Sequence, residues 1–354
     1  MRVLTSARIP ERTRSERPGM SASVLTLLVV AFVGVLGLLA QMARKSRGAE
    51  VTLTVAILAL SLLVAALGTV TGFGLLLMAA SGEPQDGVNR LAFAAAGGAE
   101  LLAGVAGVGL CVPPLRRIMG RRLGNNFWAD PPTFLALWLF VMVLANNAVG
   151  LLLFDQLPNV ESIFPAGRLS PGAVLTSQLP FVGVAVLGVG LGVRRNVRET
   201  LDRLGYGPVS VRQLGIVALF VGVALVLSLA ADSLFARLQP DLYRQVGEIS
   251  ESLFNPAGLS AAEAVLFALL VGVGAGLGEE TLFRGAVQPK LGIAATSVLF
   301  ASMHVQYGPS LLLGYVLLLS VGLGVLRERI NTTASFLAHA GYNSLGILLA
   351  YFFA

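Results

Sequence analysis

The apolar run AVLFALLVGVGAGL (Ala264–Leu277) continues directly into GEETLFRG (Gly278–Gly285), which carries two glutamates and an arginine. The length and composition of the run predict a helix inside a bilayer. Charged side chains at that depth are costly and therefore suggest a function. The chain has only two histidines, His304 and His339, and both lie in apolar segments downstream. We therefore expect the fold and the function to be organised around residues 278–285.

The composition indicates a membrane protein. Of the 354 residues, 55% are hydrophobic and only 12% are charged, and the mean hydropathy is +0.80. A soluble domain usually carries about 25% charged residues. The net charge of +6 fits basic cytoplasmic loops, and because no nucleic-acid motif accompanies it, we expect no nucleic-acid partner. The single Cys111 excludes an intramolecular disulfide and a thiolate metal cluster.

Hydropathy predicts an all-α, polytopic helix bundle with about ten transmembrane segments. The segment at 291–305 is short for a full crossing, so we expect it to be tilted or partly re-entrant. The expected segments are 22–41, 52–79, 91–112, 133–154, 173–193, 214–235, 262–283, 291–305, 310–326 and 332–353.

Positive charge is concentrated in the odd-numbered loops, which predicts that these loops are cytoplasmic and that both termini are outside. The five arginines within residues 1–19 conflict with this topology. We therefore predict that translation starts at Met20 and that residues 1–19 are not translated. A signal peptide is the alternative, although no good cleavage site follows the first apolar segment. The basic loop residues are Arg44, Lys45, Arg47, Arg116, Arg117, Arg121, Arg122, Arg194, Arg195, Arg198, Arg203, Arg212, Arg327 and Arg329.

Two parts of the chain differ in polar content. Residues 1–160 form four expected helices with little polar content beyond Glu100, whereas residues 170–354 hold both histidines and the charge cluster. The proline-containing segment Asp155–Gly172 is the predicted boundary. We find no internal repeat of the kind that many transporters contain.

Three segments of the C-terminal part carry polar groups at helical spacing. Glu280 and Arg284 are four residues apart and share a helix face, while Glu279 lies about 100° around the helix. An ion pair that anchors the helix at the interface explains the first pair equally well. The preceding glycines at 272, 274, 276 and 278 favour close helix packing.

The other two segments hold the histidines. Phe300 and His304 share one face of the next expected helix, and His339 and Asn343 share one face of the last helix. Asn343 can donate a hydrogen bond to His339, to a substrate oxyanion, or to a neighbouring helix.

Unpaired polar groups are costly in hydrocarbon, so we expect these groups to converge on one polar cavity within the C-terminal half. Two imidazoles and a carboxylate around a water can bind a metal that activates it. They can equally act as a general base and its supports without a metal. For a Zn²⁺ ion the candidate ligands are Glu279, His304 and His339, although neither histidine lies in an HExxH motif.

In this order, Glu279-Glu280-x-x-x-Arg284, Phe300-x-x-x-His304 and His339-x-x-x-Asn343 resemble the CPBP family. That family comprises CAAX prenyl endopeptidases of the Ras-converting-enzyme type and bacterial relatives that include Abi-type immunity proteins. The resemblance covers about residues 201–354 and leaves the first four helices outside.

The resemblance implies an intramembrane endopeptidase, classed in the family as a metalloprotease, with Glu279 as the base and His304 as its partner. It further implies that His339 and Asn343 stabilise the oxyanion, while Glu280 and Arg284 hold the site together. The substrate would be a membrane protein or a lipidated, CAAX-like peptide. We expect a bacterial cytoplasmic membrane, with the site open toward the cytoplasm.

Two other functions compete with this interpretation. One is a non-catalytic membrane protein that binds or sequesters a peptide, as an immunity protein does. The other is a proton-coupled transporter that uses Glu100, Glu279 and the histidines as a relay.

Overall fold

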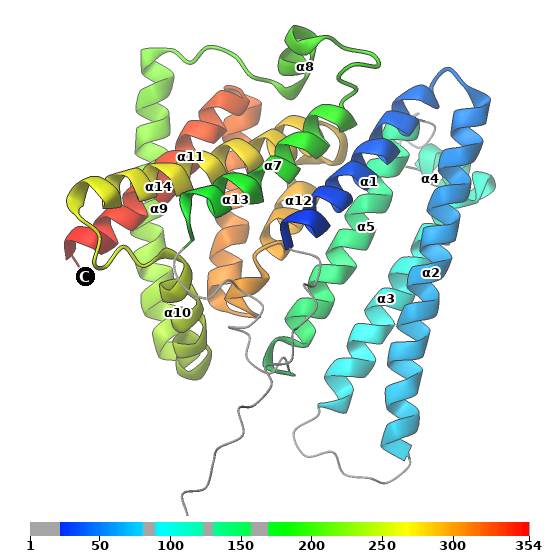
Figure 1. Cartoon of the computed structure of the whole chain (residues 1–354), viewed down its shortest axis with the longest axis horizontal. Helices are drawn as coiled ribbons and strands as arrows, with labels where there is room; N and C mark the ends of the chain where they lie inside the picture. Colours follow the sequence, from blue (N-terminus) through cyan, green and yellow to red (C-terminus); the bar gives the residue numbers. More distant parts are fainter. Residues whose placement is uncertain (1–21, 81–88, 123–129, 157–168, 354) are drawn as a thin grey trace, which may run out of the picture.

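The computed structural model describes residues 22–80, 89–122, 130–156 and 169–353, and it confirms the predicted all-α, polytopic bundle (Figure 1). Within those ranges eight helical segments are long and apolar enough to span a membrane. One of them, Ala261–Ser302, contains two of the predicted segments, and a further apolar helix covers Leu27–Met42.

The long helices are α1 (Ala22–Met42), α2 (Arg47–Ala80), α3 (Arg90–Cys111), α5 (Pro131–Leu152), α7 (Pro171–Gly188), α9 (Val211–Leu238), α11 (Ala261–Glu280), α12 (Gln288–Ser302), α13 (Leu311–Arg329) and α14 (Thr332–Phe353). The shorter elements are α4 (Pro113–Arg122), η2 (Phe154–Gln156), α8 (Val197–Leu204), α10 (Pro240–Phe254), η3 (Thr281–Val287) and η4 (Val305–Tyr307). The expected start at Met20 and most of the boundary segment, including Pro158 and Pro165, lie outside the described residues.

The sequence prediction missed three helices and misplaced two segment ends. Helices α4, α8 and α10 were missed because none contains the long apolar run that hydropathy detects. The segment predicted at 173–193 ends at Gly188, because Gly190 and Gly192 take positive φ angles of 98° and 78° in the turn that follows. The segment predicted at 291–305 ends at Ser302, which leaves His304 beyond the helix.

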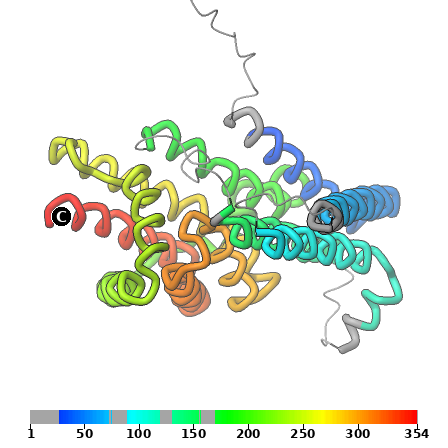
Figure 2. The backbone as a smooth tube through the Cα atoms, turned by 90° about the horizontal axis from the view of Figure 1, so that it is seen from below, coloured from blue at the N-terminus to red at the C-terminus, as the bar shows by residue number. Residues whose placement is uncertain are grey.

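The N-terminal helices pack directly on the C-terminal part of the chain. Helix α1 lies against α7, and α5 lies against α12, while α2 and α3 form a pair at the far side of the bundle (Figures 1 and 2). The division at about residues 160–170 therefore stays a prediction from composition.

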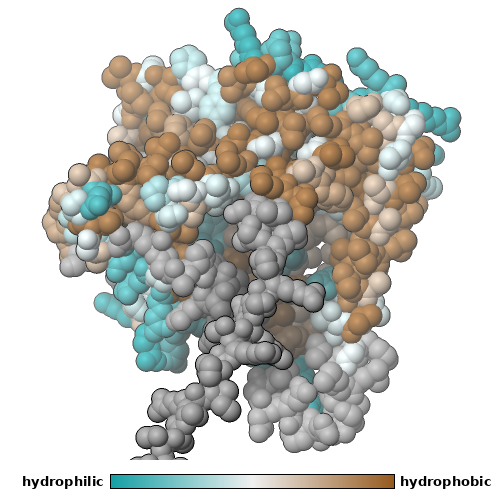
Figure 3. Space-filling model, viewed as in Figure 1, coloured by the Kyte–Doolittle hydropathy of each residue, from teal (hydrophilic) through white to brown (hydrophobic). Residues whose placement is uncertain are grey.

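Basic loops from distant parts of the sequence meet at one end of the molecule. Arg44 of the first loop pairs with Asp130 of the third at 2.5 Å. Hydrophilic atoms protrude at that end in the space-filling view, and hydrophobic atoms cover much of the helical surface (Figure 3). Helix α10 lies at the opposite end from α8 (Figure 1). The first and third loops therefore share one end of the molecule, and the side of the membrane that this end faces stays a prediction.

Glycines allow α11 to approach two helices closely. Gly272 and Gly276 face α14, where a Cβ atom on Gly276 would lie 3.1 Å from the backbone nitrogen of Ala340. Gly274 and Gly278 face α7, where a Cβ atom on Gly274 would lie 3.1 Å from Val174. Small residues are typical of such contacts between membrane helices. The result is that the end of α11, with its two glutamates, is held between α7 and α14.

Candidate active site

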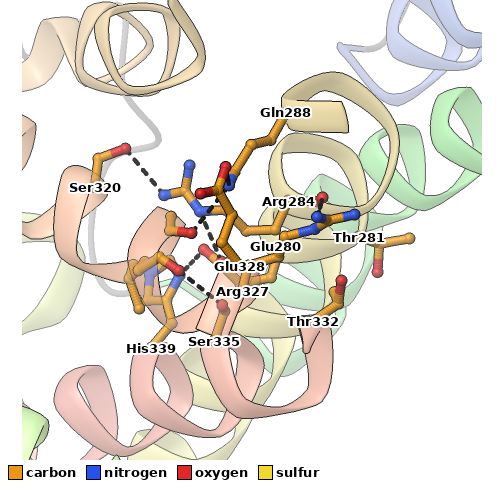
Figure 4. A network of polar contacts seen from close by, with 12 residues as sticks. Glu280, Thr281, Arg284, Gln288, Ser320, Arg327, Glu328, Thr332, Ser335 and His339 are labelled. Atoms are coloured by element: carbon orange, nitrogen blue, oxygen red, sulfur yellow. Dashed lines mark hydrogen bonds and ion pairs between the residues drawn. The ribbon is translucent and has the colours of Figure 1, made fainter. Parts of the chain in front are cut away.

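Glu280, at the end of α11, lies at the centre of a buried ion-pair network. Its side chain is 0% exposed. Arg284 Nε donates to Glu280 Oε2 at 3.0 Å, and His339 Nδ1 donates to Glu280 Oε1 at 3.0 Å (Figure 4). The predicted pairing of Glu280 with Arg284 is thus confirmed. The contact with His339 was not predicted; together with the Arg284 contact it occupies both carboxylate oxygens of Glu280.

Arg284 is equally buried and is held by three kinds of contact. Besides Glu280, its Nη2 donates to Ser320 Oγ on α13 at 2.9 Å, and its guanidinium lies 5.0 Å from the centre of the Phe300 ring. Its Nη1 is buried without a hydrogen-bond partner among the described residues. A guanidinium fixed in this way stabilises Glu280 as a carboxylate through charge and hydrogen bonds.

A π-helical turn, η3, carries Arg284 and connects α11 to α12. In a π turn each N–H bonds to the carbonyl five residues earlier, as Gln288 N does to Phe283 O. The carbonyls of Arg284 and Gly285 accept additional hydrogen bonds from Arg327 Nε at 3.2 Å and Arg203 Nη1 at 3.0 Å. These two arginines were predicted only as loop charges, and no local sequence pattern indicates that they also bond to this turn.

Gly285 is required by the packing of α8 on this turn. A Cβ atom at this position would lie 2.9 Å from a methyl carbon and 3.0 Å from the carbonyl oxygen of Leu204, closer than side chains normally approach. The glycine at the end of the GEETLFRG motif therefore has a steric explanation.

His304 lies just beyond α12 and is positioned by its neighbours. Its Nδ1 is 2.9 Å from the Phe300 carbonyl oxygen. A carbonyl oxygen only accepts, so Nδ1 carries the hydrogen and Nε2 has the lone pair in the neutral imidazole. The ring lies 4.9 Å from that of Phe300 and stacks on Tyr307 at 5.9 Å with an interplanar angle of 12°. Nε2 is therefore the nitrogen available for chemistry.

Glu279 differs sharply from its neighbour. Its side chain is partly exposed, yet Oε2 is buried and has no hydrogen-bond partner within the described part of the chain. Burial raises the pKa of the Tyr307 phenol, and the nearby Tyr342 and Glu279 raise it further. Glu279 and His304 are thus both neighbours of Tyr307, and both present an unengaged acceptor atom.

Asn343 lies one turn beyond His339 on α14 and is half-buried. Among the described residues it makes no side-chain hydrogen bond. Of its three possible partners, His339 is therefore not engaged, and His339 Nδ1 bonds to Glu280 instead. Its amide therefore has free donors next to the histidine.

The three predicted zinc ligands do not form a metal site. In the ranges that the structure describes, no group of three or more His, Cys, Asp or Glu side chains could hold a metal ion. His339 Nδ1 bonds to Glu280 and His304 Nδ1 bonds to a carbonyl oxygen, which leaves Nε2 as the unengaged nitrogen of each imidazole. In the arrangement described, Glu279, His304 and His339 are not grouped as a preformed metal cluster, and zinc binding stays a prediction.

Glu100 is remote from this cluster. It lies on α3 beside Gly68 of α2, and α3 packs against α2 and α5 on the far side of the molecule from α11 and α14 (Figure 1). Glu100 and Glu279 therefore lie in different parts of the helix bundle.

The comparison with known families agrees with the motifs. Residues 261–345 match the family described as type II CAAX prenyl endopeptidase Rce1-like. The matched segment runs from the start of α11 into α14 and contains all six predicted site residues. No curated protein and no solved structure matches the chain. The match confirms the resemblance and supports a membrane-embedded protease.

Proposed function

We propose that the chain is an intramembrane endopeptidase in which Glu279 activates water. One observation carries the proposal: two adjacent carboxylates are in opposite states. Glu280 has both oxygens occupied by Arg284 and His339, whereas Glu279 keeps a buried oxygen without a partner among the described residues. Tyr307 is a neighbour both of this carboxylate and of the His304 imidazole, whose Nε2 is unengaged. A carboxylate in that state is suited to act as a general base.

In the proposed reaction, Glu279 accepts a proton from water while the water oxygen attacks the carbonyl carbon of the scissile peptide bond. His304 Nε2 accepts a hydrogen bond from the same water and orients it. As the carbon–nitrogen bond breaks, Glu279 returns the proton to the leaving amine. No metal is needed for these steps to balance.

The oxyanion requires donors on the opposite side of the carbonyl. His339 Nε2 and the Asn343 amide lie on one face of α14 and can supply them, which makes them the proposed oxyanion site. Glu280 and Arg284 are positioning residues, because they orient His339 and bury their own charges in the network.

The proposed substrates are membrane-associated proteins or peptides, including lipidated peptides with CAAX-like ends. The family match supports this substrate class, and the apolar helix surfaces support a reaction within a bilayer. The concentration of basic loops at one end supports a site open toward the cytoplasm, in a bacterial cytoplasmic membrane.

A cleavage assay tests the proposal. The purified full chain and its Glu279→Gln and His304→Ala variants receive a library of lipidated and unlipidated peptides, and products are identified by mass spectrometry. Loss of a general base lowers the rate by about 10²–10⁴-fold. Glu251→Gln, which removes an exposed carboxylate on α10, is the matched control and should cleave normally.

The remaining outcomes distinguish the alternatives. Peptide binding by the wild type without cleavage would replace the protease by a sequestering protein. Full cleavage by Glu279→Gln would refute the assignment of the base. Activity abolished by a chelator and restored by zinc would show that the donors rearrange to bind a metal.

Sidedness is tested by labelling. A cysteine at the exposed Arg198 should react with a membrane-impermeant maleimide only after the cytoplasmic side is opened. The native Cys111 is only 8% exposed, so a low background is expected. Labelling of intact cells from outside would contradict the proposed orientation.

A further inference from the structure

A cavity of about 540 Å³ lies between α1 and α5 on one side and α7, η3 and α12 on the other. Much of its wall is apolar and includes Val33, Leu139, Phe140, Phe181 and Leu282. Phe283 also lines it, and the Phe283 ring packs against Phe300 at 5.1 Å. The cavity is therefore separated from the network around Glu280 by a layer of aromatic side chains.

Four cationic side chains line the same cavity, and few anions balance them. Arg44 and Lys290 share a single partner, Asp130, at 2.5 and 3.1 Å. Arg195 and Arg203 donate to backbone carbonyls of Val189 and Gly285, which carry no net charge. Glu199 is the acidic residue that acts on Arg195, whereas Arg194 and Arg327 add further positive charge nearby. The cavity therefore carries an excess of positive charge.

The arginines repel one another in this arrangement. Burial lowers the pKa of Arg203, and the charges of Arg195, Arg327 and Arg44 lower it further. An anion placed among them would relieve that repulsion, and a bidentate guanidinium contact suits a phosphate group.

Gln41 adds an independent sign of a ligand. Its side chain lines the cavity and is only 4% exposed. Nε2 donates to the Gly188 carbonyl at 2.6 Å, but Oε1 is buried without a hydrogen-bond partner among the described residues. A buried amide oxygen without a donor is costly, so a ligand that carries a hydroxyl or N–H group would satisfy it.

We propose that this cavity binds an anionic phospholipid, with the phosphate among Arg44, Arg195, Arg203 and Lys290 and an acyl chain against the apolar wall. The hydroxyl-bearing head group of phosphatidylglycerol would also supply a donor to Gln41. The lipid would join α1 and α5 to the C-terminal helices. Binding does not depend on peptidase activity, since the aromatic layer separates the two sites.

The experiment measures lipid binding to the purified full chain in detergent. Native mass spectrometry compares phosphatidylglycerol, phosphatidylcholine with the same acyl chains, and glycerol 3-phosphate. We expect phosphatidylglycerol to bind at least tenfold more tightly than phosphatidylcholine, and glycerol 3-phosphate alone to bind weakly. Each basic residue at a membrane surface contributes about fivefold in affinity for anionic lipid, so Arg195→Gln combined with Lys290→Gln should weaken phosphatidylglycerol binding by about 25-fold.

Two further variants keep the test decisive. Arg198→Gln removes an exposed positive charge from the same loop but outside the cavity, and it should bind the lipid normally. Ala136→Phe fills the apolar part of the cavity and should weaken binding without changing any charge. Equal binding of both lipids, an equal loss in Arg198→Gln, or tight binding of glycerol 3-phosphate alone would each overturn the proposal.

Discussion

Glu280→Gln and Glu279→Gln make the same chemical change at adjacent positions, but the structure predicts a large loss of stability for the first and almost none for the second. Glutamine at position 280 preserves the volume but removes the charge that faces Arg284 and His339, both at 3.0 Å. Arg284 is 0% exposed, so its guanidinium would stay buried without its carboxylate. Removing one partner of a buried ion pair costs about 3–5 kcal/mol, and we expect the free energy of unfolding to fall by that amount.

Glutamine at position 279 should leave stability almost unchanged. Its buried oxygen has no hydrogen-bond partner among the described residues, so no hydrogen-bonded partner is left unpaired by the change. We expect a change within about 0.5 kcal/mol, as for substitutions outside such networks. Cleavage should nevertheless be lost, because the proposed base is gone.

Both quantities can be measured on the same preparations. Reversible denaturation of the purified protein in detergent micelles gives the free energy of unfolding, and peptide cleavage gives activity. Combining Glu280→Gln with Arg284→Met should restore part of the lost stability, because the remaining buried charge is then removed as well. Two results would refute the reasoning: a loss of unfolding free energy below about 1 kcal/mol in Glu280→Gln, or an equal loss in both single variants. Either would show that Glu280 is not held in a buried ion-pair network that Glu279 lacks.

Two further predictions concern packing and pH. Gly272→Val should destabilise the fold by about 1–3 kcal/mol, because its Cβ atom would meet Ala340 of α14; Gly222→Ala, which has open space on α9, should be neutral or stabilising in the same thermal-unfolding assay. Burial raises the pKa of Asp130, but hydrogen bonds from Thr133 and Lys290 and the charges of Lys290 and Arg44 outweigh burial, so the pKa is lowered overall. The stabilisation is therefore complete above the unfolded-state pKa of about 3.9 and is lost as the pH falls through the lower folded-state value. The Asp130→Asn variant should lose this acid-dependent part of the stability, which a pH series of melting temperatures measures. If the variant and the wild type had the same pH profile, the prediction would be wrong.

Long apolar runs made the fold class predictable, because a bilayer imposes both the length and the composition of its helices. The same criterion could not detect α4, α8 and α10, whose polar faces break the apolar run. It also could not detect η3, since a π turn depends on which side chains donate hydrogen bonds to its carbonyl oxygens. Arg203 and Arg327 do so from distant loops. Their role follows from tertiary contacts that local sequence does not encode.

The residue types of the site were predictable, but most of their partners were not. Helical spacing correctly paired Glu280 with Arg284, because that contact is local. It also suggested Asn343 as the partner of His339, whereas the structure gives that place to Glu280, 59 residues away in sequence. Spacing identifies which side chains share a face, and it contains no information about which helix covers that face.

The spacing of the glycines in α11 nevertheless indicates which faces of this helix pack against other helices. Gly272, Gly276 and Glu280 recur every four residues, so Glu280 continues the face that packs on α14. Gly274 and Gly278 form a second small-residue face, which packs on α7. With two such faces, the sequence cannot decide which one meets the helix that carries His339. Once α14 is placed on the first, Glu280 must meet the histidine. Glu279 lies off that face. Its buried Oε2 has no hydrogen-bond partner among the described residues, and for this reason we propose Glu279 as the base that activates water.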